Sequence, residues 1–357
     1  MTGVGMRALA VDIGGTKIAA AVVADDGRML GRDQFPTPKT GDGDVVFTTV
    51  CAAVDGALAA AGLPGFDTDE NEYDAVPDSA RAGFLTRELG GIGVATAGPV
   101  DLTLGTVSPV NICAWRGFPL RDRLAARYGL SVRMFGDGIA IAIAEHWLGA
   151  ARGVDNFLGM VVSTGVGGGL IQGGRVMFGS GGNAGHIGHI SVDPAGPVCP
   201  CGGIGCLETI ASGTSLAKWY AGQSADLTAA NVVATDVTAS DLADAARAGD
   251  VLAQAAFTRA ATAVGMAIAG AVTLLDLDRV VIGGGVAKAF DLLREPLNAA
   301  YQKYAGLGFA HSPRVVVAEL GGDVGLLGAA AVVLHPDRYW PIPAEGGQRN
   351  RTGAGKI

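Results

Sequence analysis

The chain has 357 residues, of which 49% are apolar and 6% aromatic, with 57 glycines and a net charge of −8. This length is enough for about two domains, and the composition is typical of a compact α/β protein. The acidic charge argues against a nucleic-acid-binding surface. The longest weakly polar run, residues 261–275, is shorter than the about 20 residues of a transmembrane helix, so we expect neither nucleic acid nor a membrane as a partner.

The first half of the chain is expected to begin with a β-hairpin. Residues 7–12 predict a buried strand, residues 13–17 a glycine-rich turn and residues 18–23 the returning strand. The acidic, turn-rich residues 64–88 predict a surface insertion. The other elements expected in this half are a strand at 28–33, a helix at 44–62, a strand at 91–96, a loop with a hairpin at 97–111, a helix at 120–128 and a strand at 131–135.

The second half repeats the opening design. Residues 158–163 predict a strand, residues 164–169 a glycine-rich turn and residues 170–172 a returning strand, so the halves are expected to be duplicated domains. The tail from Pro336 is expected to be disordered. The other elements expected here are a helix at 139–150, helical residues 214–258 with a polar loop near 222–238, a helix at 259–275, a strand at 279–282, a helix from about 286, a strand at 314–318 and an apolar helix at 322–334.

A cluster of cysteine and histidine residues lies between residues 181 and 213. From His189 the spacing is H-x9-C-x-C-x4-C, which adds Cys199, Cys201 and Cys206. Three thiolates and one imidazole suit a four-coordinate structural zinc, and the glycines between them allow a tight backbone. The alternatives are a chance cluster or a disulfide, but cysteines one residue apart rarely bridge well and a third thiol would be left over.

The remaining cysteines are expected to be ordinary small side chains in the core or near the surface. They are Cys51 and Cys113. A metal cluster without a framework of disulfides fits the reducing cytoplasm, and the N-terminal residues lack the long apolar core of a signal peptide. We therefore expect a cytoplasmic protein.

Three glycine-rich turns can bring backbone N–H groups close to a phosphate. The first follows Asp12, whose carboxylate can hold Mg²⁺. Ordinary hairpin turns and close strand–helix packing are the alternatives, and no long helix follows the second turn, which disfavours a dinucleotide site. The candidate residues are Asp12, Gly14, Gly15, Thr16 and Lys17 in the first turn, Thr164, Gly165 and Gly167 in the second, and Gly283, Gly284 and Gly285 in the third.

A candidate general base follows the strand predicted at 131–135. Asp137 stands where a carboxylate at a strand end can accept the proton of a hydroxyl during phosphoryl transfer. The alternative is an aspartate that only caps the following helix.

In this order, these motifs resemble those of the ROK family of sugar kinases and sugar-responsive repressors. The matching segments are DIGGTK, STGVGGG, VIGGGV and the pattern from Gly188-His189 through C-x-C-G-x-x-G-C-x-E, and they cover the chain from residue 7 to about 335. The resemblance implies a two-domain actin-like ATPase (sugar kinase/Hsp70/actin) α/β fold with a cleft between the domains. The implied divisions are a small domain of residues 1–120 and 322–340, a large domain of residues 121–321 with a zinc loop at 186–208, and a tail of residues 341–357.

The resemblance also implies a sugar site with Asp137 as the catalytic base. Two positions depart from the family's pattern, since Gly136 stands where ROK kinases usually have Asn and His186 where they usually have Glu. Both family residues bind sugar hydroxyls, so the substrate is expected to differ from glucose, to bind weakly or to bind in another way. The implied sugar ligands are Gly98, Asn111, Gly136, Asp137, His186, His189 and Glu208.

The function implied is that of an ATP-dependent, glucokinase-like hexose kinase. Its expected partners are a sugar and ATP, with structural Zn²⁺, Mg²⁺ bound with ATP, and a homo-oligomer of two or four chains. A ROK repressor would carry a helix-turn-helix domain before DIGGTK, and eleven residues before Asp12 are too few for one. A non-catalytic or altered-specificity sugar-binding protein is the remaining alternative, favoured only by Gly136 and His186.

Overall fold

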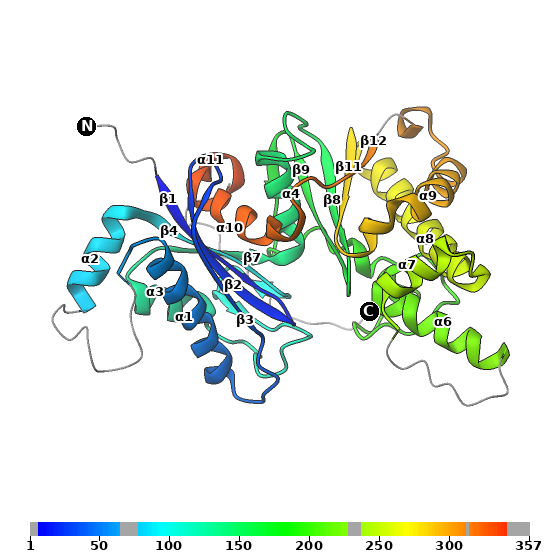
Figure 1. Ribbon diagram of the computed structural model, residues 1–357. Helices are drawn as coiled ribbons and strands as arrows, with labels where there is room; N and C mark the ends of the chain where they lie inside the picture. Colours follow the sequence, from blue (N-terminus) through cyan, green and yellow to red (C-terminus); the bar gives the residue numbers. More distant parts are fainter. Residues whose placement is uncertain (1–5, 65–77, 228–236, 312–313, 341–357) are drawn as a thin grey trace, which may run out of the picture.

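Two five-stranded sheets of the same topology organise the chain. The computed structural model describes residues 6–64, 78–227, 237–311 and 314–340 (Figure 1). The first sheet has the order β3-β2-β1-β4-β7 and the second β10-β9-β8-β11-β12. In each sheet the first two pairings are antiparallel and the last two parallel. This shared order confirms the predicted duplication of a strand–turn–strand unit.

The strands follow the apolar runs of the sequence closely. Those of the first sheet are β1 (Arg7–Ile13), β2 (Lys17–Ala24), β3 (Met29–Pro36), β4 (Leu89–Thr96) and β7 (Val132–Gly136). Those of the second are β8 (Phe157–Val162), β9 (Val166–Gln172), β10 (Arg175–Met177), β11 (Arg279–Gly283) and β12 (Arg314–Val317). A separate small hairpin, predicted at 97–111, consists of β5 (Val100–Asp101) and β6 (Thr106–Val107).

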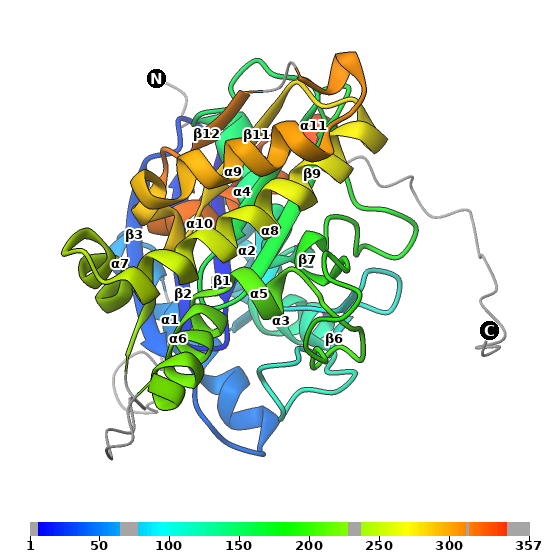
Figure 2. The same cartoon turned by 90° about the vertical axis from the view of Figure 1, so that its right-hand side faces the viewer.

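Helices cover both faces of each sheet. On the outer face of the first sheet lie α1 (Gly43–Ala60) and α3 (Leu120–Tyr128), with α2 (Asp78–Glu88) against β4. Between the sheets lie α4 (Asp137–Trp147) and α10 (Val324–Leu334) (Figure 1). The helices on the far side of the second sheet, where Figure 2 shows α8 and α9 side by side, are α5 (Glu208–Ala211), α6 (Gly213–Leu227), α7 (Ala239–Arg247), α8 (Val251–Leu275) and α9 (Phe290–Tyr304).

Small residues allow α4 and α10 to fit between the sheets. A Cβ added at Gly93 of β4 would overlap the carbonyl oxygen of Ala329 in α10, and one at Gly328 would lie 2.5 Å from the carbonyl oxygen of Ala140 in α4. α10 therefore approaches both the first sheet and α4 at backbone distance. Since α4 begins directly after β7, this packing fixes Asp137, its first residue, between the two sheets.

The pairing of β7 corrects the predicted domain boundary. β7 pairs with β4 in the first sheet, from Ile92 opposite Val132 to Thr96 opposite Gly136. A boundary between residues 120 and 121 would separate the last strand from its own sheet, so we place the division after Gly136. The prediction placed it too early because parallel pairing joins strands that lie far apart in the sequence.

Two ordered segments replace predicted loops. Within the predicted insertion 64–88, residues 78–88 form α2, whose Leu85 is fully buried, while residues 65–77 lie outside the described residues. The first residues of the predicted disordered tail are ordered, because they form α11 (Pro336–Tyr339), which follows α10 and buries Tyr339. Residues 341–357 lie outside the described residues.

The helix predicted at 259–275 is longer than expected. α8 begins at Val251, because the Asp250 carboxylate accepts the N–H groups of Leu252 and Ala253 at 2.8 and 3.0 Å. α8 and α1 are long and apolar enough to cross a membrane by length and composition alone, a test that core helices also pass. Their most apolar windows are 56% and 44% buried, and both helices contribute buried side chains to the hydrophobic cores.

The other helices are short and complete the connections. Within the described residues, four 3₁₀ turns lie at η1 (Ile187–His189), η2 (Val286–Ala289), η3 (Gly308–His311) and η4 (Gly321–Asp323). The helix expected from about residue 286 therefore begins as η2 and continues as α9. Within the helical stretch predicted at 214–258, α6 and α7 are separate, and residues 228–236 of the predicted polar loop lie outside the described residues.

Candidate functional site

The first glycine turn is held in place by a threonine that the sequence did not single out. Gly14 donates its N–H to the carbonyl oxygen of Lys17 at 2.8 Å. The hydroxyl of Thr37 donates to the carbonyl oxygen of Gly14 at 2.7 Å, and its N–H donates to the carbonyl oxygen of Thr16 at 3.1 Å. Thr37 is buried directly after β3. Its polar side chain closes the turn from a position 20 residues beyond Lys17, and spacing alone does not reveal that contact.

Asp12 lies at the end of β1 against the first turn of α10. A Cβ added at Gly325 of α10 would overlap its carboxyl group. Burial raises the pKa of the Asp12 carboxyl to about 6 from an ordinary 3.8; the charge of Lys17 opposes this shift and that of Asp137 adds to it. A carboxylate that is costly to ionise in the free protein is suited to a cation, because bound Mg²⁺ would compensate its charge.

We expect Asp12→Asn to stabilise the metal-free protein. Because the folded pKa lies above the unfolded one, the native state binds the proton more tightly, and the free energy of unfolding falls as pH rises from about 4 to about 6. Asparagine cannot ionise, so the variant should be more stable than the parent at pH 7.5 by about 1–3 kcal/mol, with the difference vanishing below about pH 4. Denaturant unfolding at both pH values measures this, and equal stability at pH 7.5 would contradict the burial of this charge.

The second turn is shorter than predicted, since residues 166–169 belong to β9. Only Ser163, Thr164 and Gly165 form the turn, which Ser163 closes by donating its N–H to the carbonyl oxygen of Gly165 at 2.8 Å. The glycines of β9 are explained by helix packing. A Cβ at Gly169 would lie 2.6 Å from the Cα of Ile139 in α4, and one at Gly167 3.4 Å from the Cα of Gly138.

The third glycine cluster lies beside the second turn. Gly284 follows β11 with a φ of +96°, and a Cβ there would lie 2.5 Å from the carbonyl oxygen of Val162. A Cβ at Gly285 would lie 3.4 Å from the hydroxyl of Ser163. Close packing between the ends of β11 and β8 therefore explains Gly284 and brings both clusters to the same edge of the second sheet.

Asp137 is the first residue of α4, directly after the N-cap residue Gly136. Protein atoms surround its carboxyl group although part of the residue is open to solvent. This burial raises the pKa of Asp137, the N–H of Gly138 that binds the carboxylate opposes the shift, and the charge of Glu208 adds to it. The structure thus brings Asp12, Asp137 and Glu208 into one electrostatic environment from three distant parts of the sequence.

Glu208 joins the cysteine-rich loop to the second turn. Its carboxylate accepts the N–H of Val166 at 2.8 Å, and a Cβ at Gly165 would lie 2.6 Å from the same oxygen. Glu208 also acts on His186, whose pKa is lowered by burial and by the charge of His189 and raised by Glu208. Glu208 therefore stabilises the second glycine turn as well as being a candidate sugar ligand.

Two other predicted sugar ligands face these turns. A Cβ added at Gly15 would overlap the side-chain amide of Asn111, so Asn111 covers the first glycine turn. A Cβ at Gly98 would lie 3.9 Å from Cε1 of His186, whose ring centroid is 5.9 Å from that of His189. These contacts bring the predicted phosphate and sugar segments to one place.

The four predicted zinc ligands converge. The ligand atoms of His189, Cys199, Cys201 and Cys206 all lie within 4.8 Å of one another. Nδ1 of His189 is 3.7 Å from Sγ of Cys199, and Sγ of Cys201 is 3.7 Å from Sγ of Cys206. Zinc–sulfur bonds of about 2.3 Å in a tetrahedron place ligand atoms about 3.8 Å apart, so these residues fit a zinc ion.

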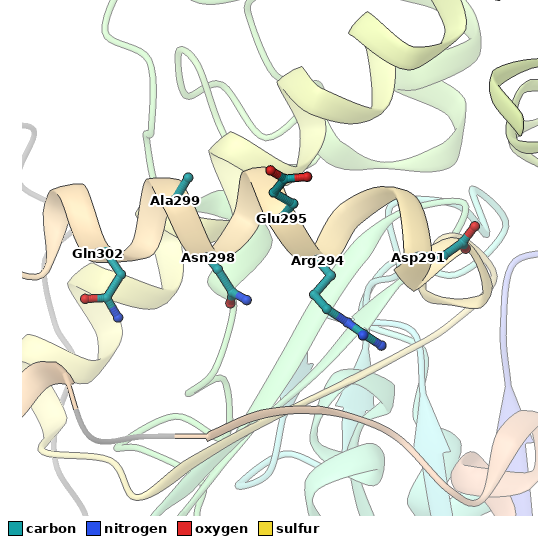
Figure 3. Close-up of a pocket in the computed structure, with 6 residues that line it drawn as sticks. All are labelled: Asp291, Arg294, Glu295, Asn298, Ala299 and Gln302. Atoms are coloured by element: carbon teal, nitrogen blue, oxygen red, sulfur yellow. The ribbon is translucent and has the colours of Figure 1, made fainter. Parts of the chain in front are cut away.

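A surface depression on α9 lies apart from this site. It is lined only by side chains of that helix (Figure 3), and they are Asp291, Arg294, Glu295, Asn298, Ala299 and Gln302. α9 lies on the far side of the second sheet from α4, where Asp137 begins the helix (Figure 1). The depression therefore contributes no residue to the candidate site.

Comparisons with known proteins identify the family of this chain. The sequence model of the ROK family matches residues 8–64 and 80–335. The chain is 33% identical over 330 residues to a glucokinase of Halalkalibacterium halodurans, covering 90% of this chain and 93% of that one. It is 34% identical over 324 residues to an N-acetylmannosamine kinase of Yersinia pseudotuberculosis, covering 91% and 97%. The crystal structure of a ROK family glucokinase from Streptomyces griseus in complex with glucose and AMPPNP superposes with a TM-score of 0.73 at 33% identity, covering 91% and 98%.

Proposed function

This chain belongs to the ROK family and is a sugar kinase, and we propose that it transfers the γ-phosphoryl group of ATP to a hydroxyl group of a hexose. Its two sheets of equal topology form the actin-like ATPase fold expected from the sequence. One observation carries the proposal. The charge of Asp137 raises the pKa of Asp12 and the charge of Glu208 raises the pKa of Asp137, although the three residues come from separate segments.

In the proposed reaction the hydroxyl oxygen of the sugar attacks the γ-phosphorus of ATP. The new oxygen–phosphorus bond forms as the bond to the β-phosphate oxygen breaks, ADP leaves, and the hydroxyl proton passes to the Asp137 carboxylate. The raised pKa of Asp137 supports this role, because a base with a higher pKa holds the proton better. The N–H of Gly138 and the helix that follows keep the carboxylate oriented.

The other segments would position the nucleotide and the metal. We assign the phosphates to the two turns at residues 14–17 and 163–165, and the adenosine to Gly283, Gly284 and Gly285. Asp12 would hold Mg²⁺, which when bound offsets the negative charge of the phosphates. Lys17, whose charge already acts on Asp12, would contact a phosphate. Asn111, packed on Gly15, would then contact a sugar hydroxyl near the transferred phosphoryl group.

The zinc ligands have a structural part in this proposal. With Nδ1 of His189 facing the cysteine thiols, its Nε2 remains able to bind a sugar hydroxyl. The zinc loop also carries Glu208, whose carboxylate accepts a hydrogen bond from the N–H of Val166. A zinc at this site would hold both sugar ligands in one orientation. The cytoplasmic location and the assembly of two or four chains stay predictions.

Nucleotide binding gives a direct test. We expect the full-length protein to bind an ATP analogue with a Kd that rises at least about tenfold when Mg²⁺ is removed, since the metal shares the charge of the phosphates. Calorimetry with and without Mg²⁺ measures this, and an assay of ADP release over a panel of hexoses and amino sugars identifies the acceptor. If no adenine nucleotide or polyphosphate binds, the kinase is excluded.

The second candidate is a sugar-binding protein without catalysis or with altered specificity. It is favoured by Gly136 and His186, which remove an amide and a carboxylate from the pattern of ROK kinases. Each lost hydrogen bond is worth about 0.5–1.5 kcal/mol. Sugar binding without any ADP release, in a protein that binds nucleotide, would favour this candidate.

A further inference from the structure

The loop that carries Asn111 folds around a single arginine. Nη1 of Arg116 lies within hydrogen-bonding distance of three carbonyl oxygens of this loop. They belong to Pro109, Ile112 and Trp115, at 2.7, 3.2 and 2.6 Å. The first two stand on either side of Asn111 in the sequence, and the third directly precedes Arg116. The arginine therefore joins both flanks of Asn111 to the end of the loop.

The positive charge of Arg116 suits this arrangement. Carbonyl oxygens carry partial negative charge, so three of them can converge only where a donor lies between them. Hydrogen bonds from an ionised donor are about twice as strong as neutral ones, and arginine stays ionised in proteins. Removal of the guanidinium would leave the three carbonyl groups facing one another, which favours a more open loop.

Other contacts hold the two ends of the loop without the Arg116 side chain. The hydroxyl of Ser108 accepts the N–H of Gly117 at 2.9 Å. The indole N–H of the buried Trp115 donates to the carbonyl oxygen of Gly43 at 3.0 Å. We therefore expect the fold to survive the loss of Arg116, and only the segment between these anchors to change its conformation.

Asn111 extends from this segment onto the first glycine turn. A Cβ added at Gly15 would lie 2.4 Å from Nδ2 of Asn111, so the amide lies directly over the glycine backbone. The turn itself is held by Thr37, whose hydroxyl donates to the carbonyl oxygen of Gly14. A displacement of Asn111 would therefore change the proposed sugar contact and leave the phosphate turn in place.

We propose that Arg116 is a positioning residue for the sugar and that it acts through Asn111. Its guanidinium holds the loop in the conformation that places the Asn111 amide over Gly15. Without it the loop adopts other conformations, and the apparent Kd for the sugar rises in proportion to the loss of the competent one. This inference rests on the proposed kinase function, because it assigns a role to a further residue of that same site.

Arg116→Met removes the donors and keeps an unbranched side chain. Arg116 is exposed, so the change leaves no cavity. We expect KM for the sugar to rise about tenfold, the lower end of what hydrogen bonds to a charged group contribute. Because bound sugar selects the competent loop, kcat should stay within about threefold, less than one hydrogen bond. KM for ATP should change as little, since Thr37 holds the turn.

The sugar for these measurements is chosen with the unmodified, full-length protein. It is whichever of glucose, mannose, N-acetylglucosamine and N-acetylmannosamine gives the highest kcat/KM in the assay of ADP release. Both KM values and kcat are then compared between variants with that sugar. Melting temperatures of the same samples show whether each variant is folded.

Arg121→Met is the matched control. Arg121 also donates to loop carbonyl oxygens, those of Leu102, Thr103 and Leu104 at 3.1, 3.3 and 3.4 Å. These residues connect β5 to β6, and the predicted sugar ligands lie outside that connection. Arg121→Met should therefore leave KM for the sugar within about twofold, as an ordinary surface substitution does.

Lysine should replace Arg116 where methionine does not. An ammonium group carries three N–H donors on one nitrogen. The three carbonyl oxygens converge on one nitrogen of the guanidinium, so its planar fork is not needed. Arg116→Lys should restore KM for the sugar to within about threefold of the parent value. A side chain that only covered the surface would be replaced equally well by methionine.

A double mutant shows whether Arg116 acts through Asn111. Asn111→Ala removes the amide that the loop presents to the sugar. Added to this variant, Arg116→Met should raise KM for the sugar by less than about twofold further, whereas the effects of independent residues multiply. An equal, about tenfold effect of Arg116→Met in both backgrounds would mean that it does not work through Asn111, and overturns the proposal.

Hydrogen exchange measures the same positioning without turnover. Deuterium uptake by residues 108–115 should increase in Arg116→Met and return to the parent level in Arg116→Lys. Unchanged uptake and unchanged KM in Arg116→Met overturn the proposal and leave the kinase intact. If none of the four sugars is phosphorylated, the proposed function fails, and calorimetric Kd values for these sugars replace KM in each comparison. Binding of none of them overturns the proposal as well.

Discussion

Asp137→Asn is expected to lower kcat by about 10²–10⁴-fold on the best sugar, the usual contribution of a general base. Asparagine has the size of aspartate, and its side-chain oxygen can still accept the N–H of Gly138. It cannot take the proton of the attacking hydroxyl. Because the nucleotide is proposed to bind to other segments, KM for ATP should remain nearly unchanged. Steady-state rates at saturating nucleotide measure both quantities.

The control for this variant is another aspartate in the first turn of a helix. Asp44 is the second residue of α1 and pairs with Arg123 on the outer face of the first sheet. Asp44→Asn removes the same charge from the first turn of another helix and should leave kcat unchanged. If Asp137→Asn kept full turnover while folding normally, Asp137 would be only the first residue of α4 and the base would lie elsewhere.

The pH dependence provides an independent check on the base. Burial raises the pKa of Asp137 and the charge of Glu208 raises it further. A general base works only when ionised, so if Asp137 is the base, kcat/KM should fall as pH drops through this raised pKa. Glu208→Gln removes the nearby charge and should move this fall to lower pH, while KM for the sugar rises because a ligand is weakened. An unmoved profile would mean that another group controls it.

Local signals in the sequence were sufficient for most elements. The apolar runs at 7–12 and 158–163 with their glycine turns predicted two hairpins, and α3 ends where expected, at Tyr128. Asp250 is an N-cap residue type and follows Gly249, so the sequence contains a signal for the start of α8. The predicted start at residue 259 instead followed the beginning of the alanine-rich run at 259–275. The buried Tyr339 was missed because the polar residues around it resemble those of a disordered tail.

Contacts between distant segments could not be read from spacing. Thr37 closes the first turn, and α10 brings Gly325 to Asp12 from more than 300 residues away. The glycines of β9 looked like part of a turn because their partner, α4, lies on another segment. Sequence motifs predicted the residue types of the candidate site, whereas packing of α4 and α10 between the sheets determines which of them meet.

Loss of zinc is expected to have the second large effect. We expect one zinc per chain in protein purified without added metal, and Cys201→Ser should abolish it. Cys201 is the exposed cysteine of the four-ligand set, so serine there leaves no cavity and tests the metal instead of packing. The sheets and their helices should remain folded, since their cores do not include this residue.

The loss of zinc should weaken sugar binding and turnover through two residues. His189 loses its orientation, and Glu208, two residues after Cys206, loses the fixed loop that places its carboxylate on Val166. Disturbing the groups that orient a site typically costs about 10–100-fold in activity, so kcat/KM for the sugar should fall by at least this factor. Cys113→Ser, which removes an exposed thiol outside the set, should change neither zinc content nor activity. Elemental analysis, circular dichroism and sugar kinetics on both variants measure the effect. Full activity in a protein that contains no zinc would show that hydrogen bonds alone hold this loop.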